Sequence, residues 1–213
     1  MSDSWKDDLK DSVKDFRDQV APVIEDWTDG RNVSVEAVTD DEMAEELDQT
    51  AGVDSWNVKH DDIVRGVASR VQYLNRLPFD SPPDTFTVRK ERPSGAKTEF
   101  EKRLYAIRKG GLYPHWTTQA YVDEPRGELL SVGRVRTKDL IEHIEDGSED
   151  NDDYYVVNPP GEASFYAVSW WRLEDIGVGV RTQKPYETQK RVEIKIDNGQ
   201  SGLGDFIADG GRK

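Results

Sequence analysis

The sequence predicts an α+β domain in which helices flank a mixed β-sheet. Segments of helical periodicity alternate with short runs rich in β-branched and aromatic residues, the pattern of a domain that contains both element types. The chain has 213 residues, enough to bury one sizeable core. Six Trp, eight Tyr and six Phe also favour a folded chain, because such rings need apolar surroundings. We expect a single domain over residues 31–198, with an amphipathic helix over 1–30 before it and a flexible tail over 199–213 after it.

The first 28 residues have the spacing of an amphipathic helix that Pro22 should kink or restart. Apolar residues recur there every three or four positions, with Asp and Lys between them: Trp5, Leu9, Val13, Phe16, Val20, Ile24 and Trp27. The apolar stripe has two interpretations, which stay open. It packs on the protein's own core, or it docks on a partner such as a viral protein or a second copy of the chain.

The remaining elements are predicted from apolar alternation, helical spacing and the Gly and Pro residues that separate them. We expect helices at residues 40–50, 97–109 and 137–144. Strands are expected at residues 33–38, 53–58, 67–74, 85–89, 117–122, 129–135, 154–158, 165–171 and 191–197.

The net charge of −14 indicates adaptation to a high-salt cell interior. Asp and Glu are scattered as single and double residues among apolar ones, as on a solvated folded surface, whereas disordered acidic proteins and nucleic-acid mimics concentrate them in blocks. The chain has no Cys, which excludes disulfides, thiolate metal sites and Cys nucleophiles. Its three His are too scattered to form a His-rich metal site.

The expected location is the cytoplasm, or the inside of a virus particle assembled there. No apolar run approaches the roughly 20 residues needed to span a bilayer, so we expect no membrane partner. The acidic N-terminus also lacks the hydrophobic segment of a secretion signal.

The middle of the chain is basic, although the whole is acidic. Residues 63–138 carry 15 basic and 8 acidic side chains, which predicts a contact with an anion. Clustered side chains that suit phosphate occur where the strand at 85–89 gives way to the helix at 97–109: Arg89, Arg92, Lys97, Lys102 and Arg103. Ser94 or Thr98 can cap that helix, whose first N–H groups also favour an anion. The alternative is a salt-bridged surface helix in which Glu99 pairs with Arg103 at i,i+4 spacing.

The order helix, GVD strand, turn, strand, helix over about residues 40–145 resembles the PD-(D/E)XK nuclease superfamily, in particular relatives carried by haloarchaea and their viruses. In that superfamily carboxylates hold Mg²⁺ and a Lys positions or activates water for attack on a phosphodiester. The resemblance implies that Glu46 (or Glu42) and Asp54 are the metal ligands. It places Arg70-Val71-Gln72 where the E-x-K motif is expected.

The sequence departs from the motif at both ends of that triplet. Arg70 has no acceptor and cannot ligate a metal, and Gln72 can orient water but carries no charge. Either cleavage is lost and binding is kept, or an acidic ligand comes from elsewhere. Glu193-Ile194-Lys195 does read E-x-K, but it lies too far along the chain and is interpreted as the polar face of a strand. Asp54 is also consistent with a simple turn cap.

No phosphate-loop, dinucleotide-binding or nucleophile-elbow signature is present. The leading hypothesis is a nucleic-acid-binding protein, for DNA in preference to RNA, with a nuclease-like fold and a weak or inactive Mg²⁺-dependent active site. The catalytic candidates are Glu46, Asp54, Arg70 and Gln72, which should share one cleft. The alternative is a non-enzymatic structural or assembly protein of a haloarchaeal virus, which would work as a homo-oligomer or through its N-terminal helix.

Overall fold

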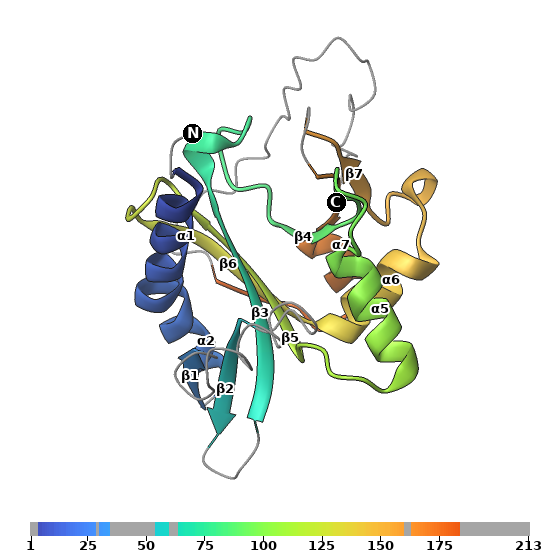
Figure 1. Cartoon of the computed structure of the whole chain (residues 1–213), viewed down its shortest axis with the longest axis horizontal. Coiled ribbons are helices and arrows are strands. Elements are labelled where there is room, and N and C mark those ends of the chain that lie inside the picture. Colours follow the sequence, from blue (N-terminus) through green and yellow to red (C-terminus); the bar gives the residue numbers. More distant parts are fainter. Residues whose placement is uncertain (1–3, 29, 35–53, 60–63, 160–162, 184–213) are drawn as a thin grey trace, which may run out of the picture.

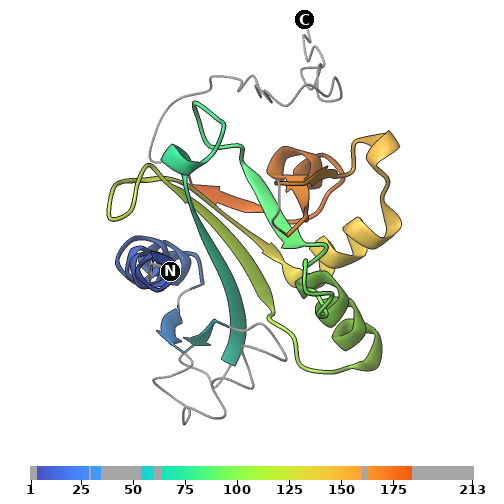
Figure 2. The same ribbon diagram turned by 45° about the horizontal axis from the view of Figure 1, so that its top comes forward.

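The computed structural model describes residues 4–28, 30–34, 54–59, 64–159 and 163–183. Within these ranges, a curled six-stranded sheet carries the N-terminal helix on one face (Figure 1). The remaining helices and a smaller three-stranded sheet pack against its other face, as Figure 2 also shows.

The larger sheet has the strand order β1-β2-β3-β5-β6-β9. The strands span Gly30–Ser34, Ser55–Lys59, Val64–Tyr73, Trp116–Val122, Leu129–Arg136 and Arg181–Gln183. All neighbours are antiparallel except β3 and β5, which run parallel. A parallel pair needs a crossover connection, and residues 74–115 provide it with a helix and a strand that lie over one face of the sheet.

The N-terminal helix consists of α1 (Ser4–Asp15), a π-helical turn η1 (Phe16–Val20) and α2 (Ala21–Thr28). Pro22 has no N–H to donate within the helix, and the chain adapts with the wider turn, in which the Ala21 N–H donates to the Phe16 carbonyl. Because a π turn uses more residues than an α turn, the apolar stripe changes phase here. Val13 is accordingly 58% exposed.

The helix packs on the protein's own sheet. The buried side chains of its second half, Val20, Ile24 and Trp27, form a core cluster with residues of β3, β5 and β6. Of the two interpretations of the stripe, packing on the core is the one observed for these residues. The side chains of Trp5 and Leu9 lie outside the described part.

The other face of the sheet is covered by α5 (Glu99–Lys109), α6 (Thr137–Asp146), α7 (Trp170–Asp175) and the smaller sheet. That sheet is antiparallel with the order β4-β8-β7, over Thr85–Arg89, Phe165–Ser169 and Tyr155–Val157. Two short 3₁₀ turns span Leu74–Arg76 and Glu149–Asn151. A second core cluster, which includes Phe86, Tyr121, Leu140, Trp170 and Leu173, fills the space between the layers.

One close approach in this core requires glycine. A Cβ atom on Gly133 of β6 would lie 2.6 Å from the indole ring of Trp170, which is itself buried at the start of α7. Since no side chain can occupy that space, Gly133 lets Trp170 pack directly on the sheet.

The predicted α+β class, with a mixed sheet flanked by helices, is confirmed. The strand predicted over 165–171 is too long: β8 ends at Ser169, because the Trp170 N–H donates to the Asp84 carbonyl and α7 begins there. Of the strand predicted over 33–38, residues 33 and 34 belong to β1 (Gly30–Ser34) and residues 35–38 lie outside the described ranges. The three-residue β9 was not predicted.

The helix expected over 40–50, the strand over 191–197 and the tail over 199–213 lie outside the described residues, so the predicted domain bounds stay a prediction. None of the described helices has the length and apolar character to cross a membrane.

Candidate functional site

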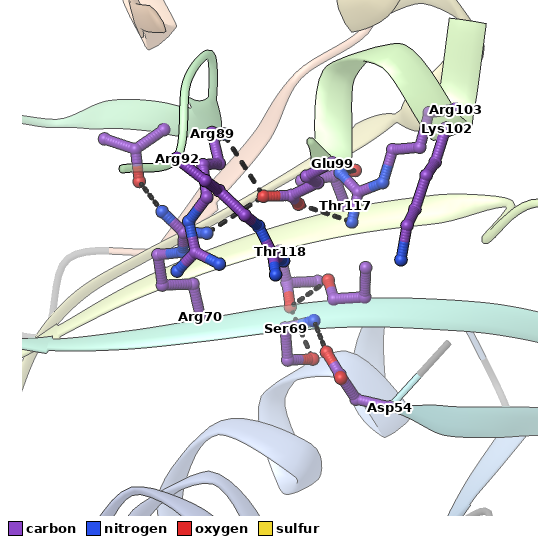
Figure 3. A pocket seen from close by; sticks show the side chains of 12 residues that line it. Asp54, Ser69, Arg70, Arg89, Arg92, Glu99, Lys102, Arg103, Thr117 and Thr118 are labelled. Carbon is purple, nitrogen blue, oxygen red and sulfur yellow. Dashed lines mark hydrogen bonds and ion pairs between the residues drawn. The ribbon is translucent and has the colours of Figure 1, made fainter. Parts of the chain in front are cut away.

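The N-terminus of α5 fixes the orientation of three charged side chains. Thr98 is the N-cap and forms a capping box with Glu101, in which each side chain accepts the other residue's backbone N–H, at 3.3 and 2.7 Å. Residues three and four positions apart on a helix share one face. Glu99, Lys102 and Arg103 therefore point together toward β3 and β5 (Figure 3).

These side chains close one side of a pocket of about 170 Å³, which we call the arginine pocket. Its wall comes from β3, β4, β5, α5 and the segments next to them (Figure 3). It contains five basic and two acidic side chains together with Ser and Thr hydroxyls: Asp54, Ala68, Ser69, Arg70, Thr87, Arg89, Arg92, Glu99, Lys102, Arg103, Thr117 and Thr118.

Glu99 is the centre of the hydrogen-bond network in the arginine pocket. Its Oε2 accepts from Arg70 Nη2 at 2.9 Å and from the Arg89 backbone N–H at 3.3 Å. Its Oε1 lies 2.6 Å from Arg103 Nη2. The carboxylate thus bridges a strand and its own helix, and both oxygens already have cationic partners.

The electrostatics of this network favour the ionised carboxylate. Burial alone would raise the pKa of Glu99, but Arg103, Arg70 and the Arg89 amide outweigh it and hold that pKa below its ordinary value. Burial also lowers the pKa of Arg103, whose side chain is only 4% exposed, while Glu99 and Asp54 oppose that shift.

Arg70 is held in place by a relay of polar side chains. Its Nη1 donates to Thr87 Oγ1 at 3.1 Å, and Thr87 in turn donates to Gln119 Oε1 at 3.0 Å. Gln119 is almost fully buried and uses its amide nitrogen to bond Gln72 Oε1 at 2.9 Å. Gln72 therefore supports Arg70 through Thr87 and Gln119 and does not line the arginine pocket itself.

Arg89 and Arg92 differ from the other basic side chains of the pocket. Within the residues that the structure describes, neither guanidinium makes a hydrogen bond or an ion pair, and the Nε atoms of both are buried without an acceptor. The cation of Arg89 lies 5.6 Å from the Phe165 ring centroid. Burial, followed by repulsion from Arg70 and Arg92, lowers the pKa of Arg89. Glu99 opposes that shift, but no described carboxylate forms an ion pair with either guanidinium, so this half of the pocket has an excess of positive charge.

Asp54 lies on the far side of β3 from Glu99 (Figure 3). Its Oδ2 accepts the Ser69 backbone N–H at 2.5 Å, and its own N–H donates to the Val67 carbonyl. The Ser69 hydroxyl accepts from Thr118 Oγ1 at 2.9 Å. Asp54 thus links the start of β2 to β3 and at the same time lines the pocket.

The two groups of candidate residues merge in this single site. Asp54 and Arg70 from the nuclease-like motif line the same pocket as four of the predicted phosphate-binding residues, Arg89, Arg92, Lys102 and Arg103. Lys97 does not line it, and its Nζ lies 5.6 Å from the Tyr105 ring centroid. Glu46 and Glu42 lie outside the described residues.

Two features limit the chemistry of the site. Among the described residues, no group of three His, Asp or Glu side chains is placed to hold a metal ion. The capping box at the start of α5 uses the backbone N–H groups of Thr98 and Glu101, so these two groups are not available to an anion. The arrangement suits an oxyanion held by guanidinium groups.

Comparison of the chain with known protein families, with curated proteins and with solved structures finds no match. The assignment of the site therefore depends on its own geometry.

Sequence reasoning missed the role of Glu99, which was considered only as a helix-stabilising partner of Arg103. It also missed the hydroxyls of Thr87, Thr117 and Thr118. The signal for Glu99 was its position, because it is an acid in the first turn of the helix that follows the basic residues Arg89 and Arg92.

Proposed function

We propose that this protein binds nucleic acid by holding a backbone phosphate in the arginine pocket. The observation that supports this most strongly is the pair Arg89 and Arg92, whose buried Nε donors have no acceptor among the described residues. Their mutual repulsion would be relieved by an anion, and the pocket has basic side chains in excess.

Phosphate is the anion that these side chains suit. Guanidinium groups bind phosphate oxygens bidentately. In molar salt the Debye length is only about 3 Å, so direct contacts rather than long-range attraction must supply affinity. A cluster of arginines meets that requirement better than a diffuse basic surface.

We further propose that the site belongs to a PD-(D/E)XK-like core in which binding is kept and cleavage is slow or absent. Asp54 lines the pocket in the position that the motif gives to a metal ligand. The other described carboxylate, Glu99, has both oxygens on arginines, so the described donors do not make a Mg²⁺ ligand set. For this reason we derive no metal-dependent step.

Binding is tested with labelled single- and double-stranded DNA and with RNA, at several KCl concentrations. The double variant Arg89→Gln/Arg92→Gln should weaken binding on the order of tenfold or more for all sequences alike, as expected when phosphate contacts are lost. The control Arg17→Gln/Lys138→Gln removes the same charge from exposed positions outside the pocket and should bind like the wild type. Equal weakening in both variants would indicate that net charge, not the pocket, is responsible.

Cleavage is tested with the same substrates in the presence of Mg²⁺ or Mn²⁺. Asp54→Asn should keep or strengthen nucleic-acid binding, because it removes a negative charge from the pocket. It should abolish whatever metal-dependent cleavage the wild type shows. Efficient cleavage by the Asp54→Asn variant would contradict any catalytic role of Asp54.

A further inference from the structure

A second group of arginines lies on the opposite face of the six-stranded sheet. Arg134 of β6 stands directly opposite Arg181 of β9 in the antiparallel register, so their side chains share a face. Arg65 of β3 is five residues before Arg70, and this odd separation places the two side chains on opposite faces. We call Arg65, Arg134 and Arg181 the second arginine cluster.

The cluster is interleaved with two tryptophans. Arg134 lies 4.2 Å from the Trp116 ring centroid and 5.5 Å from that of Trp27. Arg65 contacts the Trp116 ring at 5.9 Å, and Arg181 contacts the Trp27 ring at 5.5 Å. The result is an alternating set of cations and indole rings on the face that α2 covers.

Positive charge in this cluster is not neutralised by the described part of the chain. None of the three guanidinium groups pairs with a described carboxylate. The one hydrogen bond that they make to the described residues is donated by Arg181 Nη1 to the Trp27 carbonyl. Arg134 is 8% exposed, and its Nε and Nη1 are buried without an acceptor.

The charges also act on one another and on a neighbour. Burial, then repulsion from Arg181 and Arg65, lowers the pKa of Arg134 to about 10. Burial, then Arg65, Arg136 and Arg134, lowers the pKa of His115, and Asp139 opposes this only in part.

The indole rings offset only part of the free-energy cost of burying these guanidinium groups. A ring face attracts the cation above it, but it accepts no hydrogen bond from N–H groups in the guanidinium plane. An arginine this buried, flanked by two more and by no acid among the described residues, is the arrangement expected around an oxyanion.

We propose that Arg134, together with Arg65 and Arg181, forms a second oxyanion site that takes a phosphate group. Three guanidinium groups that pair with no carboxylate of the described ranges call for more negative charge than one carboxylate ligand supplies, which favours a phosphate dianion. The site lies on the other face of the sheet from the arginine pocket and does not depend on the function proposed for that pocket.

Inorganic phosphate is the direct probe, titrated into the full chain at constant ionic strength and followed by calorimetry. The wild type should bind two phosphates per chain, one in each site, and the variant Arg89→Gln/Arg92→Gln should bind one. Because Trp27 and Trp116 contact the cluster, the phosphate that remains should also change the tryptophan fluorescence in a saturable way.

The cluster is then removed in the Arg89→Gln/Arg92→Gln background. Adding Arg65→Gln/Arg181→Gln should weaken the affinity for the remaining phosphate on the order of tenfold or more, as expected for the loss of charged hydrogen bonds. These two substitutions leave the buried Arg134 in place between Trp27 and Trp116. Adding Arg134→Lys instead should weaken it to a similar extent, because a lysine keeps the charge but loses the bidentate geometry.

The two sites can fail separately. No saturable phosphate binding by the Arg89→Gln/Arg92→Gln variant, or unchanged binding after the cluster substitutions, would overturn the second site. One phosphate in the wild type that survives Arg89→Gln/Arg92→Gln and is lost with Arg65→Gln/Arg181→Gln would support the second site and contradict the arginine pocket.

Discussion

Glu99 accepts from the side chains of Arg70 and Arg103 and from the Arg89 backbone amide, so this one carboxylate holds two basic side chains at the pocket. It also competes with any anion that enters. The same residue therefore stabilises the folded site and weakens the binding of an anion to it, and the two effects can be separated by experiment.

Replacing Glu99 by Gln should lower the free energy of unfolding by about 3 kcal/mol, because Arg103 is left buried without its counter-charge. Phosphate should restore part of the lost stability of the variant. It should also bind to the variant more tightly than to the wild type. Urea unfolding with and without phosphate measures both effects. The exposed pair Lys138–Glu142 provides the control, and Glu142→Gln should cost about 0.5 kcal/mol or less.

The stability that Glu99 provides should depend on pH in one direction. Its pKa is lowered in the folded state, so its contribution is fully present above the pKa of an unfolded Glu, about 4.3, and is lost as the pH falls through the folded value. The stability difference between wild type and Glu99→Gln should be largest near neutral pH and shrink in acid. A difference that grows on acidification would contradict the assigned ion pairs.

At the level of elements, apolar spacing predicted the middle of the chain well. The strand at 85–89 has the bounds predicted for it, and the helices at 99–109 and 137–146 begin and end within two residues of the prediction. Spacing could not show that β4 leaves the main sheet, because both sheets use the same alternation. Nor could it show that Trp170 begins a helix, since that depends on a tertiary hydrogen bond to Asp84.

The basic residues of the candidate site, and Asp54 among its acidic ones, could be predicted from the sequence. That they all line one pocket could not. Arg89, Arg92, Lys102 and Arg103 were grouped by their positions in the sequence, whereas Asp54 and Arg70 came from a family resemblance. Only the crossover that carries α5 over β3 brings the two groups into one pocket. The second arginine cluster was missed because its members are 47 to 116 residues apart and meet only through sheet register.

The N-terminal helix offers a test with a built-in control. Ile24 is fully buried against the sheet, so Ile24→Ala should lower the free energy of unfolding by about 2–5 kcal/mol. Val13 is 58% exposed, and Val13→Ala should change it by about 0.5 kcal/mol or less.

Both values should be independent of protein concentration, since the packing is within one chain. If the stability of the wild type instead rose with concentration, the helix would also bury apolar surface on a partner, as the alternative interpretation of its stripe proposed.

For the whole molecule, the net charge of −14 leads to a dependence of stability on salt. Acidic side chains repel one another when screening is removed. Thermal unfolding from about 0.1 to 3 M KCl should show a rising Tm, because the screening length falls from about 10 Å at 0.1 M to about 3 Å at 1 M. A Tm that is flat across this range would contradict adaptation to high salt.

The central claim is that Arg89 and Arg92 contact nucleic-acid phosphate, and the salt dependence of affinity tests it most directly. Each phosphate neutralised contributes about −0.7 for single strands, or −0.9 for duplexes, to the slope of log K against log[KCl]. Arg89→Gln/Arg92→Gln should flatten that slope by about one unit or more, whereas Arg17→Gln/Lys138→Gln should leave it unchanged. The claim is contradicted by an unchanged slope in the pocket variant. It is contradicted equally by a wild type that binds no nucleic acid at any salt, which would favour the assembly role instead.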